Sequence, residues 1–376
     1  MNIAFDAKRA YNNRSGLGNY SRDIIRAIIK KQEDNIYLFS TKFNQSVFDI
    51  KPLLSPLNFV ENIQPEEPID KWLTAYWRSF SIVKDVRKRK IDIFHGLSNE
   101  LPFTLGKSVK TVVTIHDLIF KRYPQWYKPI DRKMYDWKFK SACINADKII
   151  AISEQTKADI IKFYLIDENK IEVVYQTCND SFKTKASDSL ISAVKKKYNL
   201  NDEFLLNVGT IEQRKNALNI VKAIKQHNIK TPLYIIGRNT KYAEEIKSYI
   251  KKNNLEKQIQ ILHDVSNEEL PVFYQLAKVF IYPSTFEGFG IPIIEALYSG
   301  TPVITSKGSC FSEPGGEDSI YVEVGNVDEL GKSILDVIND KAKCKLMQEK
   351  GLQHVKTFDS DKVTKDLYKV YDSLIR

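Results

Sequence analysis

The chain has 376 residues, of which 43% are hydrophobic and 28% charged, with four cysteines and a net charge of +10. This composition is that of a soluble globular protein and excludes a disordered chain and a disulfide-rich scaffold. No apolar run approaches the roughly 18 residues that a membrane-spanning helix needs. The chain is long for a single hydrophobic core, which predicts two domains.

The positive charge lies mainly in the first half of the chain. Residues 1–185 hold 31 Lys+Arg and 22 Asp+Glu, whereas residues 186–376 hold 26 and 25. A basic domain favours an acidic substrate, an anionic membrane surface or nucleic acid. The lysines are dispersed and no nucleic-acid motif accompanies them, so we expect no nucleic-acid partner.

The cysteines and the first residues of the chain indicate the cellular compartment in which the protein works. The four cysteines are widely spaced, without metal-ligand spacing, which predicts free buried thiols in a reducing compartment. The segment from Met1 to Asp6 lacks the basic and long apolar stretches of a signal peptide. We therefore expect a cytoplasmic protein.

Short branched apolar runs alternate with helical patterns along the whole chain, which predicts two α/β halves, each with a parallel sheet covered by helices on both faces. The strands expected in the first half are Asn2–Phe5, Ile36–Phe39, Ile91–Phe94, Thr111–Ile115, Lys148–Ile152 and Ile171–Tyr175. Those expected in the second half are Phe204–Val208, Pro232–Ile236, Ile259–Leu262, Val279–Tyr282, Val303–Thr305 and Ser319–Val322. Ligands of such doubly wound sheets bind at the carboxyl ends of the strands.

The expected domains are 1–185, a linker region 186–200, a second domain 201–355, and a C-terminal helix within 356–376. The linker region also contains a helical pattern, from Ser189 to Tyr198. Helical spacing in the last segment is set by Val363, Leu367, Val370 and Leu374.

A glycine pair, Gly16 and Gly18, lies between the first strand and an expected helix, Ser21–Lys30. Such a pair allows backbone N–H groups to approach a diphosphate, although it is as common in tight turns. The third glycine of a dinucleotide fingerprint is missing, because that position is Ser21. A nicotinamide-dependent dehydrogenase is therefore disfavoured.

Two histidines follow strands of the first half. His116 and Asp117 end one strand, where side chains enter a ligand crevice; Asp117 either orients the imidazole or caps the next turn. His95 has the analogous position after a neighbouring strand, and we treat it as a candidate acceptor-side residue. Ser153 closes another strand and predicts an N-cap.

Two adjacent cations, Arg214 and Lys215, stand between Gly209 at a strand end and an expected helix, Ala217–Ile224. Guanidinium and ammonium groups at this position suit a diphosphate, because they form charge-assisted hydrogen bonds. We expect the pair to lie across a cleft from Glu287.

Two carboxylates, Glu287 and Glu295, flank a strand-to-helix turn that begins at Ser284. The helix start between them is marked by Gly288, Gly290 and Pro292. Glu287 is therefore expected on the loop and Glu295 in the helix. Backbone N–H groups at the helix start attract phosphate, and the carboxylates accept hydrogen bonds from sugar hydroxyls.

This Glu, seven residues, Glu pattern and the following segment Ala296–Val303 resemble glycosyltransferase family 4 (glycosyl transferases group 1), in its mannosyltransferase-like form. The resemblance implies a GT-B fold: two Rossmann-like doubly wound domains that face each other across a cleft, with the C-terminal helix packed on the first domain. It implies a retaining, metal-independent enzyme without cofactor, whose cation pair replaces a divalent metal.

The resemblance also implies site residues. The catalytic residues would be His116, Glu287, Arg214 and Lys215. The donor-binding residues would be Gly16, Gly18, Gly209, Arg214, Lys215, Gly237, Val265, Glu287, Gly288, Phe289, Gly290 and Glu295. Val265 would present backbone groups to the base, whether guanine or uracil. The order Glu313–Pro314 departs from the family pattern, so Glu313 receives no role.

The sequence thus predicts a glycosyltransferase that moves a hexose from a nucleotide diphosphate sugar, GDP- or UDP-linked and possibly GDP-mannose, to a glycan or lipid-linked glycan in surface polysaccharide biosynthesis. Two alternatives remain open: a GT-B sugar-nucleotide epimerase, and a non-catalytic nucleotide-sugar-binding subunit.

A last pattern concerns membranes. The aromatic residues Trp72, Tyr76, Trp77 and Phe80 precede five cations between Lys84 and Lys90. One amphipathic helix carrying both suits an anionic membrane surface, and the same pattern suits a helix packed on the sheet with a solvated basic face. Peripheral contact with the inner face of a membrane is therefore one expectation.

Overall fold

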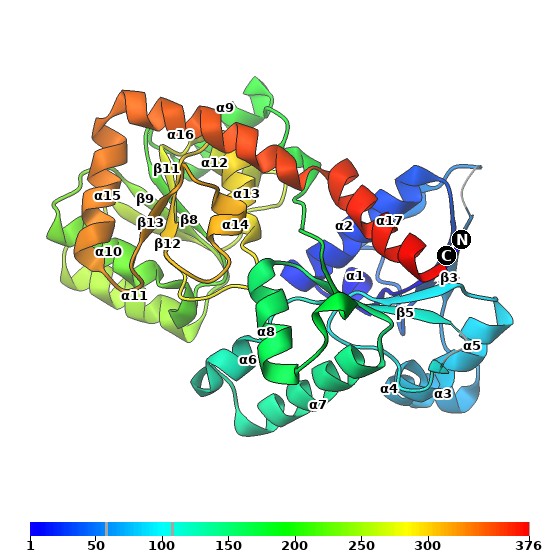
Figure 1. Ribbon diagram of the computed structural model, residues 1–376. Helices are drawn as coiled ribbons and strands as arrows, with labels where there is room; N and C mark the ends of the chain where they lie inside the picture. The colour runs from blue at the N-terminus through cyan, green and yellow to red at the C-terminus, as the bar shows by residue number, and fades with distance from the viewer. Residues whose placement is uncertain (57–58, 107–108, 376) are drawn as a thin grey trace. The chain divides into compact units, whose positions relative to one another are not determined.

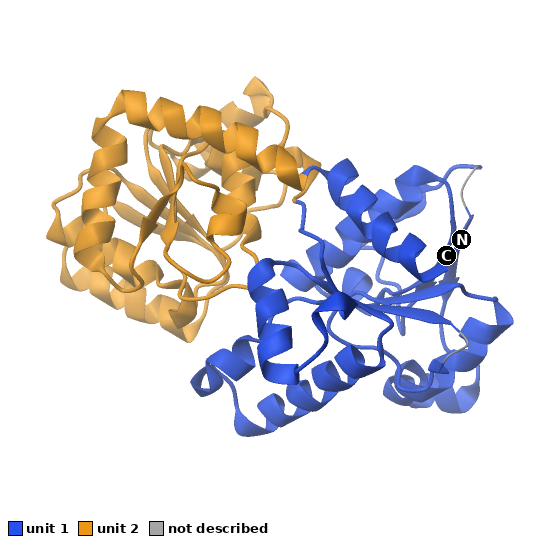
Figure 2. Ribbon diagram, viewed as in Figure 1, with its two compact units in different colours: residues 1–177, 359–376 blue, residues 178–358 orange. Residues whose placement is uncertain are grey.

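The computed structural model describes residues 1–56, 59–106 and 109–375 and divides into two compact units (Figure 2). Unit 1 comprises residues 1–177 and 359–376, and unit 2 comprises residues 178–358. The division lies before Cys178 and not after residue 185. Phe182 is buried in unit 2, with its ring centroid 5.5 Å from that of Tyr274, which ties this segment to the second unit.

The sheet of unit 1 has seven parallel strands in the order β3-β2-β1-β4-β5-β6-β7. Its strands are β1 (Asn2–Asp6), β2 (Asn35–Phe39), β3 (Phe59–Ile63), β4 (Ile93–Gly96), β5 (Lys110–Ile115), β6 (Lys148–Ala151) and β7 (Ile171–Val173). All but β3 were expected. β3 is a half-exposed edge strand, so its side chains lack the continuous apolar run of a central strand.

The sheet of unit 2 has six parallel strands in the order β10-β9-β8-β11-β12-β13. Its strands are β8 (Leu205–Val208), β9 (Leu233–Ile236), β10 (Ile259–Leu262), β11 (Val279–Tyr282), β12 (Val303–Ser306) and β13 (Ile320–Val322). The sequence predicted each of them. Both sheets are doubly wound, which confirms the fold class predicted for the two halves.

Helices cover both faces of each sheet (Figure 1). Those of unit 1 are α1 (Lys8–Asn12), α2 (Gly16–Lys31), α3 (Pro68–Trp72), α4 (Thr74–Tyr76), η2 (Trp77–Ser81), α5 (Ile82–Lys88), α6 (Ile119–Arg122), α7 (Pro129–Asn145), α8 (Glu154–Tyr164) and α17 (Ser360–Ile375), with short 3-10 turns η1 (Lys51–Leu53), η4 (Pro124–Trp126) and η5 (Glu168–Lys170). Those of unit 2 are α9 (Asp188–Tyr198), α10 (Ala217–Gln226), α11 (Lys241–Lys252), α12 (Leu270–Leu276), α13 (Ile291–Tyr298), α14 (Ser312–Gly315), α15 (Val327–Asn339) and α16 (Lys341–His354), with 3-10 turns η6 (Asp180–Phe182), η7 (Gln213–Lys215) and η8 (Val355–Phe358).

The alternation of side chains along β1 divides the core of unit 1 into two layers. Ile3 and Phe5 pack with α1, α2 and α17 on one face, whereas Ala4 packs with Trp77 and α5 on the other. Successive residues of a strand point to opposite faces, and both faces are covered here. This explains why the strands are continuously apolar in sequence.

The last helix, α17, belongs to unit 1. Its buried side chains, Val363, Leu367 and Tyr371 among them, join the core cluster that contains α2. The hydroxyl of Tyr371 is 2.7 Å from Nδ1 of the buried His95. The helix therefore completes a core that the first 177 residues leave open.

The helix expected from Ser189 to Tyr198 within the region 186–200 is confirmed, because α9 spans Asp188–Tyr198. Two expectations about local structure differ from the structure. Helix α2 begins at Gly16, so the glycine pair lies in its first turn and not in a loop before Ser21. The aromatic and basic segment from Trp72 is not one helix, because Leu73 (φ −104°, ψ 58°) separates α3 from α4.

Replacing a core residue of α17 tests its place in unit 1. We expect Leu367→Ala to lower the free energy of unfolding by about 2–5 kcal/mol, because it removes a fully buried side chain and leaves a cavity. Urea unfolding measures the change. Lys365→Ala, at an exposed position of the same helix, is the control; an equal and small effect of both changes would contradict the packing of α17.

Candidate active site

The candidate donor site of unit 2 lies where the order of its strands reverses. β8 is flanked by β9 on one side and by β11 on the other, so the connections after β8 and β11 leave in opposite directions. A crevice opens at the carboxyl ends of such a pair, and ligands bind there. Gly209 directly follows β8, and the loop from Ser284 to Gly290 follows β11. The loop and the turn η7 carry half of the predicted donor residues.

Two glycines shape the strand ends. Gly209 has φ +150°, a conformation that other residues rarely adopt. A Cβ at Gly237, which follows β9, would lie 1.9 Å from the carbonyl oxygen of Gly209. The backbones thus approach too closely for any side chain at position 237.

The turn into α13 matches the sequence-based expectation. Gly290 is the N-cap, with φ +116°, and α13 begins at Ile291 with Pro292 in its first turn. Glu287 therefore lies on the loop and Glu295 within the helix. The carboxylate of Glu295 accepts a hydrogen bond of 2.9 Å from the hydroxyl of Tyr274, which fixes one of its oxygens.

Arg214, Lys215 and Glu287 form one ionic cluster. Oε1 of Glu287 is 2.8 Å from Nη1 of Arg214 and 2.5 Å from Nζ of Lys215. The same oxygen accepts hydrogen bonds from the hydroxyls of Tyr282, at 3.1 Å, and Ser284, at 2.6 Å. The expectation that the cation pair lies across a cleft from Glu287 is wrong, since the three side chains touch within unit 2.

The electrostatics of this cluster follow from its composition of two cations and one anion. Burial by itself would raise the pKa of Glu287, but Lys215 and Arg214 outweigh it and hold that pKa at about 2. Burial lowers the pKa of Lys215, and repulsion by Arg214 lowers it further, which together outweigh the attraction of Glu287. Burial would also lower the pKa of Arg214, but Glu287 and Glu212 raise it above its ordinary value. The three groups have one excess positive charge, which the half-exposed carboxylate of Glu212, 2.7 Å from Nη2 of Arg214, balances.

Two residues of the cluster were not assigned a role from the sequence. Tyr282 ends β11, where it accepts a hydrogen bond of 2.5 Å from Lys215 Nζ, and Ser284 opens the loop. Their position at the carboxyl end of a strand of the switch point is the sequence signal that indicates them.

The backbone of the loop that carries Glu287 is bound by the side chains of Ser309 and Cys310. The Ser309 hydroxyl donates to the carbonyl of Glu287 at 3.1 Å, and the Cys310 thiol lies 2.8 Å from the carbonyl of Phe289. Burial raises the pKa of Cys310, so the thiol stays protonated. The backbone of Glu313, in the next turn, accepts a hydrogen bond of 2.9 Å from His354 Nε2.

Val265 lies on the loop after β10, half-buried, where the sequence placed it. The loop is joined to the neighbouring strand end by His263, whose Nδ1 is 2.8 Å from the carbonyl oxygen of Gly237. The remaining loop glycine, Gly288, lies between Glu287 and the buried ring of Phe289.

Two glycines of unit 1 were predicted to bind the donor. Gly16 begins α2, and a Cβ at Gly18 would lie 1.9 Å from the carbonyl oxygen of Asn13. Gly18 is thus required by a close backbone approach, whereas Gly16 has open space around it.

His116 follows β5 and is buried. Its Nε2 donates to the carbonyl of Leu97 at 2.9 Å, and its Nδ1 lies 3.2 Å from Nε2 of Gln176. Burial lowers its pKa to about 4, more than the Leu97 carbonyl raises it, so the ring is neutral near pH 7. Asp117 accepts a hydrogen bond of 3.1 Å from the Ile119 amide. Of the two roles expected for Asp117, this contact corresponds to capping the next turn.

His95 is part of the core. Its Nδ1 bonds Tyr371 and its Nε2 lies 2.8 Å from the hydroxyl of Thr114, with none of its surface exposed. The expectation of an acceptor-side role for His95 is therefore wrong. Ser153 is the N-cap of α8 and accepts a hydrogen bond of 3.0 Å from the Thr156 amide, as predicted.

We searched for metal and membrane features in residues 1–56, 59–106 and 109–375. Within these ranges, no group of three or more His, Cys, Asp or Glu side chains is arranged to hold a metal ion. An Asp-x-Asp pair, Asp359 and Asp361, stands at the start of α17 in unit 1. In the same ranges, no helix combines the length and apolar character needed to cross a membrane.

Solved structures with a similar fold include a glycosyltransferase. The chain superposes on a glycosyltransferase from Rickettsia africae with a TM-score of 0.79 at 19% identity, covering 100% of this chain and 98% of that one. HepE from Anabaena, crystallised with UDP, gives a TM-score of 0.79 at 17% identity, covering 99% and 100%. The two doubly wound sheets with their reversed strand order define a GT-B fold.

Two family models match the chain: Glycosyltransferase Family 4 over residues 14–181, and Glycosyl transferases group 1 over residues 191–354. The chain belongs to this glycosyltransferase family. It is 26% identical to O-antigen chain mannosyltransferase B of Escherichia coli, covering 77% of this chain and 76% of the relative. It is 27% identical to O-antigen chain mannosyltransferase RfbU of Salmonella typhimurium, covering 71% and 73%.

The pKa of Glu287 leads to a prediction about stability. This pKa lies at about 2, below the 4.5 of an ordinary glutamate, so the ionised carboxylate stabilises the fold above pH 4.5 and loses this effect as pH falls toward 2. A shift of this size corresponds to about 3 kcal/mol. Glu287→Gln should lower the free energy of unfolding by roughly this amount near pH 7.

Urea unfolding of the wild type and of Glu287→Gln at several pH values measures this difference. We expect the difference to shrink as pH falls from about 5 toward 2, because the wild type then loses the same charge. Glu317→Gln, on the surface of unit 2, is the control. A constant difference over the whole range would show that the charge of Glu287 is not responsible.

Proposed function

We propose that the protein transfers a hexose from a nucleotide diphosphate sugar to a hydroxyl of a glycan or lipid-linked glycan, with retention at the anomeric carbon. The observation that carries the proposal is the cluster of Arg214, Lys215 and Glu287 at the switch point of unit 2, in which two adjacent cations share one carboxylate oxygen. Family membership supports the reaction class.

The cation pair is proposed to bind the diphosphate. Guanidinium and ammonium groups form charge-assisted hydrogen bonds with phosphate oxygens, and two adjacent cations would compensate the charge of a diphosphate. The same cations would stabilise the negative charge that develops on the leaving nucleotide. The geometry is prepared in advance, because Arg214 is also held by the carbonyl oxygen of Phe286 at 2.5 Å.

We propose that the two glutamates bind different parts of the donor. The contacts of Glu287 with Arg214, Lys215, Tyr282 and Ser284 all use Oε1. We assign Oε2 to a hydroxyl of the donor sugar. Glu295, in the helix, would accept hydrogen bonds from the ribose hydroxyls, with its carboxylate oriented by Tyr274.

Transfer would break the bond between the anomeric carbon and the phosphate oxygen and form one to the acceptor oxygen. The acceptor proton would pass to the departing phosphate, on the same face of the sugar, which gives retention without a covalent enzyme intermediate. His116 would then position the sugar, and a hydroxyl would have to replace Gln176 at its Nδ1.

The donor is proposed to be GDP-mannose, since two relatives are named mannosyltransferases of O-antigen chains. HepE was crystallised with UDP and with UDP-glucose, which makes UDP-sugars the comparison in any test. The names of these relatives also support a place in surface polysaccharide biosynthesis, and we propose that the protein acts in the cytoplasm.

We further propose that unit 1 contacts an anionic membrane that carries the acceptor. Trp72 and Tyr76 are exposed by 82% and 52%, and on α7 Ile130 and Trp137 are exposed by 76% and 58%. Lys71, which precedes Trp72 on α3, is exposed too. Aromatic side chains and cations together favour the interface of anionic bilayers. Trp77 is not part of this surface, because it is buried against Phe39.

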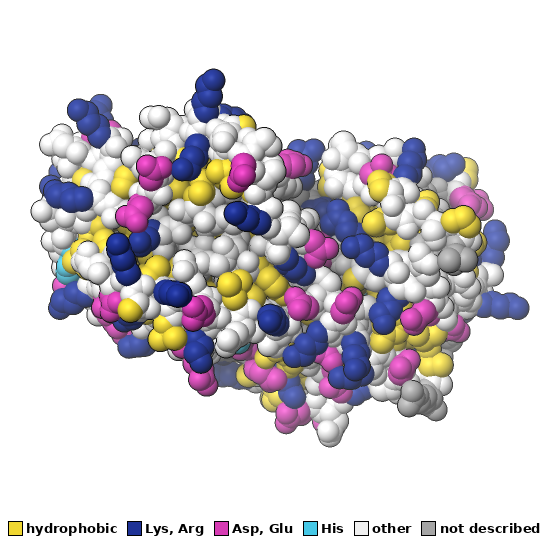
Figure 3. Space-filling view, turned by 90° about the horizontal axis from the view of Figure 1, so that it is seen from above, with side chains coloured by type: hydrophobic (Ala, Val, Ile, Leu, Met, Phe, Trp, Pro, Cys, Tyr) yellow, Lys and Arg dark blue, Asp and Glu magenta, His cyan; other side chains and the backbone are white. Residues whose placement is uncertain are grey.

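Nucleic acid is not supported as a partner. On the face seen in Figure 3, Lys and Arg side chains are spread widely and interspersed with Asp and Glu. A nucleic-acid surface is typically a basic stripe.

The first prediction of this proposal concerns the cation pair. Arg214→Ala and Lys215→Ala should each weaken binding of GDP or UDP by about 1.5–3 kcal/mol, roughly 10- to 100-fold in Kd, because a charge-assisted contact is lost. Isothermal titration calorimetry measures the affinity, and Lys257→Ala, at an exposed position of unit 2, is the control.

Product analysis with GDP-mannose, UDP-glucose and glycan acceptors complements the binding data. Unchanged nucleotide affinity in both variants would remove the assigned role of the pair. Consumption of the donor with an epimeric nucleotide sugar as product would favour the epimerase alternative. Binding without turnover for any acceptor would favour the non-catalytic subunit.

The second prediction concerns metals. Because protein cations would neutralise the leaving diphosphate, turnover should persist in excess chelator. Activity is measured with and without EDTA, and then with added Mg²⁺ or Mn²⁺. A complete loss of activity that either ion restores would contradict metal independence.

The third prediction concerns the membrane. The protein should sediment with anionic vesicles at low salt, less at high salt, and little with neutral vesicles, because screening weakens the cation contribution. Trp72→Ser combined with Lys71→Ser should reduce this binding. The control is Lys257→Ser in unit 2. Absence of binding to anionic vesicles at low salt would favour an acceptor that is not membrane-bound.

A further inference from the structure

The ammonium group of Lys215 has two contacts that differ in kind. Its Nζ is 2.5 Å from Oε1 of Glu287, and it donates a second hydrogen bond of 2.5 Å to the hydroxyl of Tyr282. An ammonium group carries three N–H bonds and accepts none. Two of the three are used here, and the third has no partner among the residues that the structure describes. The direction of the third N–H is set by the other two.

The hydroxyl of Tyr282 binds both charged groups of this pair. Because a lysine can only donate, the phenol oxygen accepts from Nζ of Lys215 and donates its own hydrogen to Oε1 of Glu287 at 3.1 Å. Burial raises the pKa of Tyr282, and Glu287 raises it further, so the hydroxyl keeps this hydrogen. Tyr282 therefore orients the cation and the carboxylate at the same time.

The position of this hydroxyl is set by the packing of the Tyr282 ring. Tyr282 ends β11 and is 1% exposed. Its ring is stacked on Phe280, with centroids 5.8 Å apart, and lies perpendicular to the ring of Phe311, with centroids 6.4 Å apart. A ring packed in this way cannot turn aside without disturbing a close-packed core. The hydroxyl is thus a fixed point at the carboxyl edge of the sheet.

The space beside the ring is open at the end of β8. A Cβ at Gly209 would lie 3.9 Å from Cε2 of Tyr282, and no other described residue beyond the chain neighbours of Gly209 comes within 4 Å of it. A ligand that approaches the backbone at Gly209 would therefore lie next to the ring of Tyr282.

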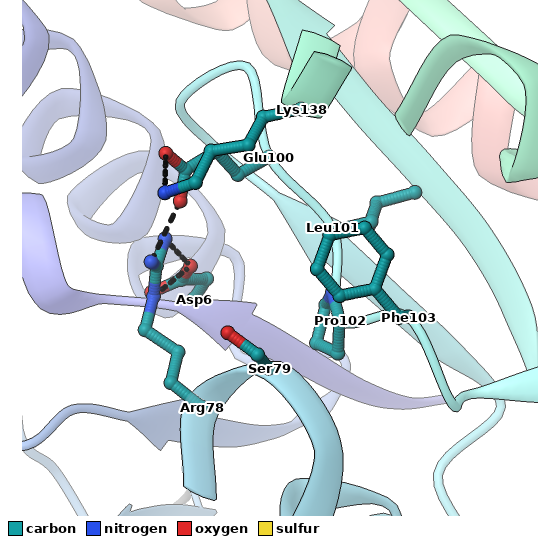
Figure 4. A pocket seen from close by; sticks show the side chains of 8 residues that line it. All are labelled: Asp6, Arg78, Ser79, Glu100, Leu101, Pro102, Phe103 and Lys138. Carbon is teal, nitrogen blue, oxygen red and sulfur yellow. Dashed lines mark hydrogen bonds and ion pairs between the residues drawn. The ribbon is translucent and has the colours of Figure 1, made fainter. Parts of the chain in front are cut away.

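The corresponding point of unit 1 shows a different arrangement, in which carboxylates hold the cations (Figure 4). There Arg78 is paired with Asp6 at 2.5 Å and with Glu100 at 2.7 Å, and Lys138 is paired with Glu100 at 3.2 Å. Each carboxylate orients a cation but also compensates its charge. The phenol hydroxyl in unit 2 orients the ammonium group of Lys215 without adding a negative charge.

We propose that Tyr282 is a positioning residue of the donor site that acts through Lys215: its hydroxyl holds the ammonium group so that the third N–H is available to an oxygen of the diphosphate. The assignment rests on the proposed function, in which Lys215 binds the diphosphate. Without the hydroxyl, a second N–H would lose its partner. Because a buried N–H without a partner is unfavourable, the ammonium group would turn and lose its alignment with the diphosphate.

The change Tyr282→Phe removes the hydroxyl and keeps the ring. We expect it to weaken binding of GDP or UDP roughly tenfold in Kd, as measured by isothermal titration calorimetry, because the ammonium group is no longer aligned. The control is Tyr234→Phe, which affects another fully buried tyrosine of unit 2. The hydroxyl of Tyr234 donates to Asn201 at 3.0 Å. Asn201 precedes β8 and so lies at the opposite edge of the sheet, and nucleotide affinity should not change.

A double-mutant cycle separates positioning from a general structural effect. In the Lys215→Ala background, Tyr282→Phe should leave the affinity for GDP or UDP unchanged, because the group through which Tyr282 acts is absent. An equal loss of affinity in both backgrounds, or no loss when Lys215 is present, would overturn the proposal. Thermal unfolding of each variant verifies its fold.

Urea unfolding of the same proteins keeps this proposal distinct from the proposed function. Absence of GDP and UDP binding by the wild type would contradict the proposed function. The contact between Tyr282 and Lys215 is tested without any nucleotide, since the effects of the two changes on the free energy of unfolding should then not add. Additive effects would overturn the assignment of Tyr282 as the residue that holds Lys215.

Discussion

The reversal of strand order in each sheet is the constraint on which the rest of the structure depends. At β1 and β4, and again at β8 and β11, the connections leave a pair of neighbouring strands in opposite directions. Charged side chains are costly in a buried sheet, but they are tolerated at this edge, where they find partners on the diverging loops. Asp6 and Glu100 occupy the edge in unit 1, and Lys215 and Glu287 occupy it in unit 2.

Both edges carry cations paired with carboxylates. In unit 2, Arg214 and Lys215 share one oxygen of Glu287, and Arg214 also pairs with Glu212 at 2.7 Å. In unit 1, Arg78 lies between Asp6 and Glu100, and Lys138 pairs with Glu100. At each edge the charges that the strand ends bring together therefore stabilise one another.

Contacts in the neighbouring loops and strands hold both edges in place. In unit 2 the close approach of Gly237 to Gly209 and the thiol of Cys310 fix the loops that carry the ionic cluster. In unit 1 the hydroxyl of Thr114 lies between His95 and Tyr20, and Tyr371 of the last helix bonds the same histidine. Groups oriented in advance need little reorganisation when a ligand arrives, which is how such sites favour a developing charge.

The sequence by itself determined the features that depend on neighbours along the chain. Continuous apolar runs predicted the buried strands, and the glycines and proline before Ile291 predicted the start of α13, because these signals act within a few residues. The edge strand β3 was missed because it is half-exposed and lacks a continuous apolar run. The start of α2 was missed because glycines, which are rare in helices, occupy its first turn. Only the tertiary structure decided which charges meet. Glu287 contacts Lys215 from 72 positions away, and Asp6 contacts Arg78 across the same interval, because the order of strands, and not the spacing of residues, brings them to one edge.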